Sequence, residues 1–147
     1  MSAISISQVP AARPSTTAAS RAAWIGHVVS GLPLAFLVFD TAIKVLRLPV
    51  AVEATRQLGF TDGAVLALGI IEAICLVLYL MPRTALLGAL LWTGYFGGAI
   101  ATHIRAASPL FTHTLFPMYL AALLWGGLWL RDPRLRRIVR LALAGVS

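Results

Sequence analysis

The chain has 147 residues, of which 59% are hydrophobic and 12% are charged, and its mean hydropathy is +0.87. A soluble domain usually carries about 25% charged residues, so this composition excludes an ordinary soluble globular protein. The net charge of +7 does not indicate nucleic-acid binding, because the basic residues stand mostly at the ends of apolar runs and no aromatic-basic surface accompanies them. Cys75 is the only cysteine, which excludes an internal disulfide.

Residues 1–21 are rich in Ser, Ala, Thr and Pro and lack a continuous apolar run, which predicts a disordered tail rather than a cleaved signal peptide. Four apolar runs follow, and each is long enough to cross about 30 Å of hydrocarbon as a helix. The predicted spans cover residues 22–46, 63–81, 84–104 and 114–130. The fold class is therefore an all-α membrane protein, with a four-helix transmembrane domain over residues 22–130.

The segment PVAVEATRQLGF, residues 49–60, separates the first two spans. Pro49 is suited to begin a short helix and Gly59 to end one. The pattern predicts an interfacial helix across the end of the bundle. Its water-facing residues would be Glu53, Arg56 and Gln57, and its inward-facing residues Val50, Ala54 and Leu58.

The distribution of Lys and Arg predicts the orientation of the chain in the membrane. One side carries Arg13, Arg21, Arg83, Arg131, Arg134, Arg136, Arg137 and Arg140, and the other carries Lys44, Arg47, Arg56 and Arg105. This bias places both termini in the cytoplasm and the bundle in the inner (plasma) membrane as a multi-pass protein. Residues 131–147 then form a basic amphipathic cytoplasmic tail, which either lies on anionic lipid or acts as a plain stop-transfer anchor.

With this topology, the outer ends of the spans gather most of the polar side chains. Asp40 and Lys44 are four residues apart and can form an ion pair on one helix face, with Lys44 near the membrane edge. Glu72 lies about ten residues into the second span and has no partner in its own helix. Intramembrane acidic residues normally face the interior of a bundle, so we expect Glu72 to do so. A structural ion pair and a functional site remain alternatives.

Near the outer ends of the third and fourth spans, His103, Arg105 and His113 are expected to face Asp40 and Glu72. A histidine at a helix end is more often a hydrogen-bonded interfacial residue than a ligand. The residues at i, i+4 and i+8 in the third span form a small-residue face for close packing against another helix: Gly94, Gly98 and Thr102. No His/carboxylate pair has the spacing of a metal site, so no metal is expected.

The sequence resembles the DoxX-like family of small bacterial membrane proteins. Three blocks carry the resemblance: FDTAIK at 39–44, LYLMPRTALLGALLWTGYFGGAIATHIR at 78–105, and LFPMYLAALLWGGLWLRD at 115–132. The resemblance implies a four-helix membrane bundle. Some members of this family are associated with quinone-linked sulfur oxidation, and others with oxidative-stress complexes. Matched to the family pattern, the polar positions to test are Asp40, Lys44, Glu72, Tyr95, His103 and Arg105.

Three functions fit these observations. The first is a pocket in the outer half of the bundle that binds a small amphipathic ligand, for which a quinone is the candidate. The second is a non-catalytic anchor or accessory subunit for a membrane or soluble oxidoreductase. The third is a small transporter, which would require a homo-oligomer because four spans are few for alternating access. No motif for a bound redox cofactor and no catalytic residue can be assigned.

Overall fold

The structure is a computed structural model that describes residues 16–145. These residues form α1 (Thr16–Val45), α2 (Pro49–Gln57), α3 (Asp62–Leu80), α4 (Ala85–Arg105), the π-helical turn η1 (Leu110–Thr114), α5 (Phe116–Arg131) and α6 (Pro133–Ala144). Residues 16–145 contain no strand, so the all-α prediction is confirmed. Within this range, four segments are long and apolar enough to span a membrane: Ser20–Val45, Asp62–Leu80, Ala85–Arg105 and Leu110–Arg131.

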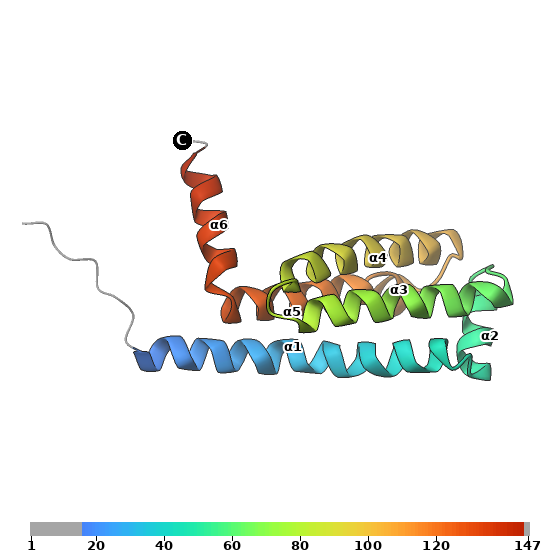
Figure 1. Ribbon diagram of the computed structural model, residues 1–147. Helices are drawn as coiled ribbons and strands as arrows, with labels where there is room; N and C mark the ends of the chain where they lie inside the picture. Colours follow the sequence, from blue (N-terminus) through green and yellow to red (C-terminus); the bar gives the residue numbers. More distant parts are fainter. Residues whose placement is uncertain (1–15, 146–147) are drawn as a thin grey trace, which may run out of the picture.

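The four long helices form an antiparallel bundle (Figure 1). Helix α1 packs against α3 and α5, and α4 packs against the same two helices from the other side. Helices α1 and α4 are therefore diagonal to each other across the bundle.

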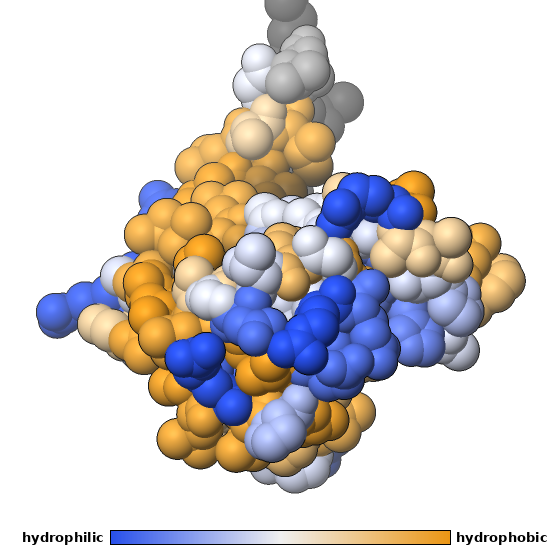
Figure 2. Space-filling view, turned by 90° about the vertical axis from the view of Figure 1, so that its right-hand side faces the viewer, coloured by the Kyte–Doolittle hydropathy of each residue, from blue (hydrophilic) through white to orange (hydrophobic). Residues whose placement is uncertain are grey.

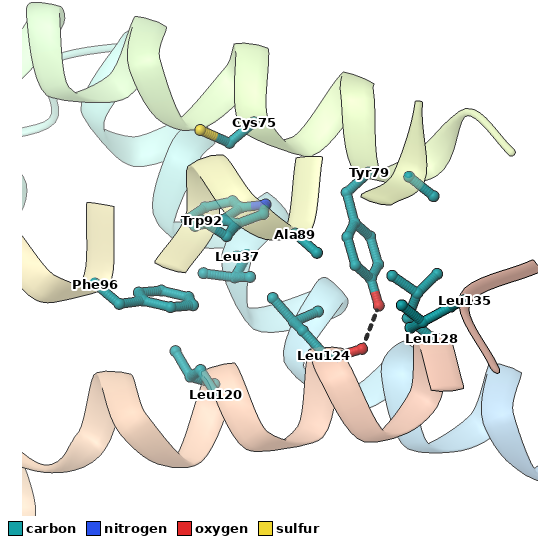
Figure 3. Close-up of a cluster of buried hydrophobic side chains, with 11 residues drawn as sticks. Leu37, Cys75, Tyr79, Ala89, Trp92, Phe96, Leu120, Leu124, Leu128 and Leu135 are labelled. Carbon is teal, nitrogen blue, oxygen red and sulfur yellow. Dashed lines mark hydrogen bonds between the residues drawn. The ribbon is translucent and has the colours of Figure 1, made fainter. Parts of the chain in front are cut away.

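The interior of the bundle is apolar except at a few positions. Trp92 and Phe96 of α4 stack on each other with ring centroids 5.0 Å apart, and Leu37 and Leu124 pack in the same cluster (Figure 3). The Tyr79 hydroxyl donates a hydrogen bond of 2.7 Å to the Leu124 carbonyl oxygen. The outer faces of the helices are rich in exposed large apolar residues, as expected for surfaces that contact lipid.

The observed helix bounds agree closely with the predicted spans, with two differences. Helix α1 begins at Thr16, so residues 16–21 of the predicted disordered tail are helical. The remainder of that tail lies outside the described residues. The fourth span is preceded by the π-helical turn η1, and α5 begins only at Phe116 with Pro117 in its first turn.

Helix α2 lies across the end of the bundle, as predicted (Figure 1). Its buried residues, however, are Ala51 and Thr55, so the prediction that Val50 and Ala54 face inward is wrong. The Leu46–Leu48 turn contains Arg47 with φ of 51°, and this turn sets the rotation of α2. The rotation depends on the backbone of the turn and cannot be deduced from the apolar pattern of nine residues.

The tail predicted to be basic and amphipathic is the helix α6, which projects away from the bundle (Figure 1). Asp132 caps its N-terminus, because its Oδ1 accepts a hydrogen bond of 2.8 Å from the Arg134 backbone N–H. Pro133 ends α5 and begins α6, since proline fits the first turn of a helix but not its interior.

Candidate functional site

Three helices contribute to one partly buried polar cluster, which consists of Asp40, Thr41, Lys44, Glu72 and Tyr95. We call this set the Glu72 cluster. Asp40, Thr41 and Lys44 stand on one face of α1, because residues three and four apart are neighbours on a helix. The Lys44 Nζ lies 2.6 Å from the Asp40 Oδ2, which confirms the predicted ion pair.

Glu72 is at the centre of the cluster, and its side chain is 0% exposed. One carboxylate oxygen accepts hydrogen bonds from the Lys44 ammonium and the Tyr95 hydroxyl. The other oxygen accepts a hydrogen bond of 3.3 Å from the Thr41 hydroxyl. Both oxygens are therefore paired, and the partners come from α1 and α4 on opposite sides of α3.

Tyr95 brings α4 into the cluster. Its hydroxyl donates to Glu72, and its oxygen lies 3.4 Å from the Lys44 Nζ. Its ring packs edge-on against Trp92, with centroids 5.6 Å apart. Within the described part of the chain, the buried Trp92 Nε1 has no hydrogen-bond partner.

A glycine sets the depth at which Lys44 enters the bundle. A Cβ on Gly69 would lie 2.9 Å from the Lys44 Cβ, so α1 can approach α3 this closely only because residue 69 has no side chain. Gly69 is three residues before Glu72, which places Lys44 on the same face of α3 as the carboxylate. Gly69 is also about 10 Å along α3 from Asp62, at 1.5 Å per residue. Lys44 therefore lies inside the bundle. The sequence had suggested a position near the membrane edge, and that expectation is corrected.

The charges in the cluster do not balance. Two carboxylates face one ammonium group, and the ion pairs among residues 16–145 bring no second cation to this cluster. The Asp40 and Lys44 side chains remain 25% and 17% exposed, so the cluster is open to its surroundings through α1. The Glu72 cluster can form a hydrogen bond with a molecule that approaches along α1, or transfer a proton to or from it.

His103 and Arg105 are not part of the Glu72 cluster. The His103 Nδ1 lies 3.1 Å from the Ser108 Oγ, and its ring centroid is 6.0 Å from that of His113. Arg105 donates a hydrogen bond of 2.7 Å to the Leu58 carbonyl oxygen. The physical reason is distance, because His103 is eight residues beyond Tyr95, or about 12 Å along α4. The expectation that these side chains face Asp40 and Glu72 is therefore corrected.

A second polar group covers the end of the bundle at which α2 lies. The Arg56 guanidinium lies 2.9 Å from the Asp62 Oδ2 and 3.3 Å from the Glu53 Oε2. Hydrogen bonding to Asp62 raises the pKa of Arg56. Figure 2 shows hydrophilic residues gathered on this end of the molecule, with apolar surface around its sides. This group links α2 to the start of α3 and is exposed, so it closes the bundle end without forming a buried site.

Sequence reasoning missed Thr41 and Trp92. Thr41 had a readable signal, since it lies three residues before Lys44 and therefore shares a helix face with it. Trp92 had none, because an indole in an apolar run is usually only a core residue. Among residues 16–145, no three His, Cys, Asp or Glu side chains come together as a set that could hold a metal ion.

Comparison with known proteins identifies the family. The model of the DoxX-like family matches residues 28–127, which include α2, α3, α4 and most of α1 and α5. All five residues of the Glu72 cluster lie within this range. No curated protein and no solved structure matches the chain. The match covers more than half of the sequence, and the chain therefore belongs to the DoxX-like family.

Proposed function

We propose that the Glu72 cluster binds a small amphipathic ligand of the quinone class, in the outer half of the membrane. The observation that supports this function is the buried Glu72 carboxylate, which accepts hydrogen bonds from Thr41, Lys44 and Tyr95 inside a membrane-spanning bundle. A carboxylate at such a depth costs roughly 2.5–3.5 kcal/mol on insertion scales. Apolar packing alone does not require that cost.

A purely structural role explains the cluster less well. Replacing a buried ion pair with apolar residues of similar volume is often neutral or stabilising, so the pair is weak evidence for a stabilising role. Ionisable residues within membrane spans usually mark ligand or proton pathways. The cluster also has two carboxylates and only one ammonium group, which favours a site that takes up a proton or binds a ligand with a hydrogen-bond donor.

The surroundings of the cluster suit a flat ligand with an apolar tail. Asp40 follows Phe36 by one helical turn, and Phe36 packs edge-on against Phe116 at 5.1 Å. The Phe36 and Phe39 side chains are 41% and 63% exposed, next to the accessible Asp40 and Lys44. In this proposal Lys44 donates to a ligand carbonyl, Asp40 accepts from a ligand hydroxyl, and the phenylalanines contact the ring and tail.

Titration with a short-chain quinone tests this function, with tryptophan fluorescence as the signal because Trp92 adjoins Tyr95. We expect Glu72→Gln to weaken binding by about tenfold or more, because the variant loses the charged acceptor that holds Lys44 in position for the ligand, and a hydrogen bond to a charged group contributes about 1.5–3 kcal/mol. His103→Ala is the matched control and should bind like the wild type, because His103 lies outside the cluster. Equal binding by wild type and Glu72→Gln would contradict the proposal.

We further propose the inner membrane as the location of the bundle, with both termini in the cytoplasm. The support is the excess of arginines at the end of the bundle formed by Arg21, Arg83 and α6, since cytoplasmic loops are enriched in Lys and Arg. The Glu72 cluster then belongs to the half of the bundle nearer the outer face.

A second candidate function is that of an anchor for an oxidoreductase, and α6 favours it. This helix projects from the bundle, carries Arg134, Arg137 and Arg140 as exposed cations, and leaves Ile138 and Leu141 exposed at 53% and 64%. Deleting the chain after Asp132 should release such a partner and leave the four spans intact. A partner that still co-purifies with the shortened chain would exclude α6 as the anchor. The oligomeric transporter stays a prediction from the sequence.

A further inference from the structure

A cavity of about 580 Å³ lies at the other end of the bundle from α2, where α3, α4 and α5 have their inner ends. Three arginines line it: Arg83 from the α3–α4 turn, Arg131 from the end of α5, and Arg134 from the start of α6. We call it the arginine cavity. Its volume is in the range of small-molecule binding pockets.

The arginines of this cavity lack acidic partners. Within the described part of the chain, no carboxylate oxygen lies within 4.0 Å of a guanidinium nitrogen of Arg83, Arg131 or Arg134. Asp132 also lines the cavity, but one of its oxygens accepts the hydrogen bond that caps α6. Three arginines against one aspartate leave an excess of two positive charges.

Arg131 is held in place by Tyr79. Its guanidinium lies over the Tyr79 ring, 4.8 Å from the ring centroid, and its Nη2 is 3.5 Å from the Tyr79 carbonyl oxygen. A guanidinium has five N–H donors, so most of its donors remain free for a ligand. The stacked position fixes the planar group in advance, which lowers the entropy lost when it binds an anion.

Helix dipoles do not decide the sign of the ligand. Helices α3 and α5 end at the cavity, and α4 and α6 begin there, so their opposite dipoles largely offset each other. The sign is set by the arginines. His27 and Tyr79 also line the cavity, and the rest of its lining is apolar and includes Leu80, Ala85 and Leu128.

We propose that the arginine cavity binds a phosphate group. A phosphate group, even as the diester of a phospholipid, offers two unesterified oxygens to the fork of a guanidinium, which is the geometry that arginine matches best. The group can belong to an anionic phospholipid or to free phosphate. The lipid fits the surroundings better, because basic pockets between transmembrane helices bind anionic headgroups and the apolar lining can contact the start of an acyl chain.

Native mass spectrometry of the full chain in mild detergent tests this site. Dioleoylphosphatidylglycerol and dioleoylglycerol, which share their acyl chains and of which only the first carries a phosphate group, are titrated separately, and the fraction of protein carrying one lipid is measured. We expect the anionic lipid to bind with higher affinity. Arg83→Gln and Arg131→Gln should each weaken that binding by about tenfold. Arg140→Gln removes the same charge from the exposed face of α6, outside the cavity, and should change it by less than about twofold.

Arg83→Gln keeps the test valid if Arg131→Gln unfolds the bundle, because Arg83 is exposed. Millimolar inorganic phosphate separates the two sources of the phosphate group. Displacement of the lipid by phosphate supports a site for the phosphate group alone, and retention of the lipid supports a site that also requires the acyl chains. Equal binding of the two lipids, or an equal loss in Arg140→Gln and Arg83→Gln, would overturn the proposal.

Discussion

Lys44 is the cation on which two carboxylates inside the bundle depend. We predict that Lys44→Met lowers the free energy of unfolding by roughly 3–5 kcal/mol, because it leaves Asp40 and Glu72 without a positive partner. Unfolding in detergent micelles measures the change. Adding Glu72→Gln to Lys44→Met should recover much of the loss, since the buried carboxylate is then gone. A double variant no more stable than the single one would show that Lys44 does not act through Glu72.

Single residues also show how far the site could be predicted from the sequence. Asp40 and Lys44 were predictable as a pair because both lie on one helix, where spacing determines which side chains meet. The contact of Tyr95 with Glu72 joins α4 to α3 and depends on how each helix is rotated and how deep it lies. The sequence contains no direct signal for either quantity. Because neither the rotation nor the depth of a helix can be deduced from the sequence, His103 and Arg105 were predicted to lie closer to Glu72 than they do.

The packing of α1 on α5 depends on a contact between two glycines. A Cβ on Gly127 would lie 2.8 Å from the Gly26 carbonyl oxygen and would also collide with the Ser30 hydroxyl. We predict that Gly127→Ala destabilises the bundle by about 1–3 kcal/mol, the range typical of overpacked cores. The adjacent Gly126→Ala is the control, because nothing lies within 4 Å of its added Cβ.

Thermal unfolding of both variants checks this prediction. Gly126→Ala should be neutral or slightly stabilising, since alanine favours a helix by about 0.8–1.0 kcal/mol over glycine. If the two substitutions have the same effect, the close approach of α1 to α5 does not contribute to stability.

The helices themselves were largely predictable, because proline residues and polar ends limit each apolar run. Which helices pack against each other was not predictable from the sequence. The small residues Gly94 and Gly98 predicted close packing, yet a Cβ at either position would meet no atom within 4 Å. The close approaches occur instead at Gly26, Gly69, Gly88 and Gly127. A small-residue pattern identifies a face that can pack closely, but which helix fills it depends on the whole bundle.

The molecule as a whole has an orientation that labelling can test. In a Cys75→Ala background, we predict that Gln57→Cys reacts with a membrane-impermeant thiol reagent applied from the outside, and that Gly145→Cys reacts only after the membrane is permeabilised. Gln57 lies on α2 and Gly145 follows α6, at opposite ends of the bundle. The reverse pattern would place both termini outside and would move the Glu72 cluster to the cytoplasmic half.

The proposed ligand of the Glu72 cluster can be detected directly by mass spectrometry of organic extracts from gently solubilised protein, with wild type, Glu72→Gln and His103→Ala purified in parallel. We predict a quinone that co-purifies with the wild type and with His103→Ala and that is lost from Glu72→Gln. An extract without quinone from the folded wild type, or equal amounts in all three proteins, would contradict the proposal.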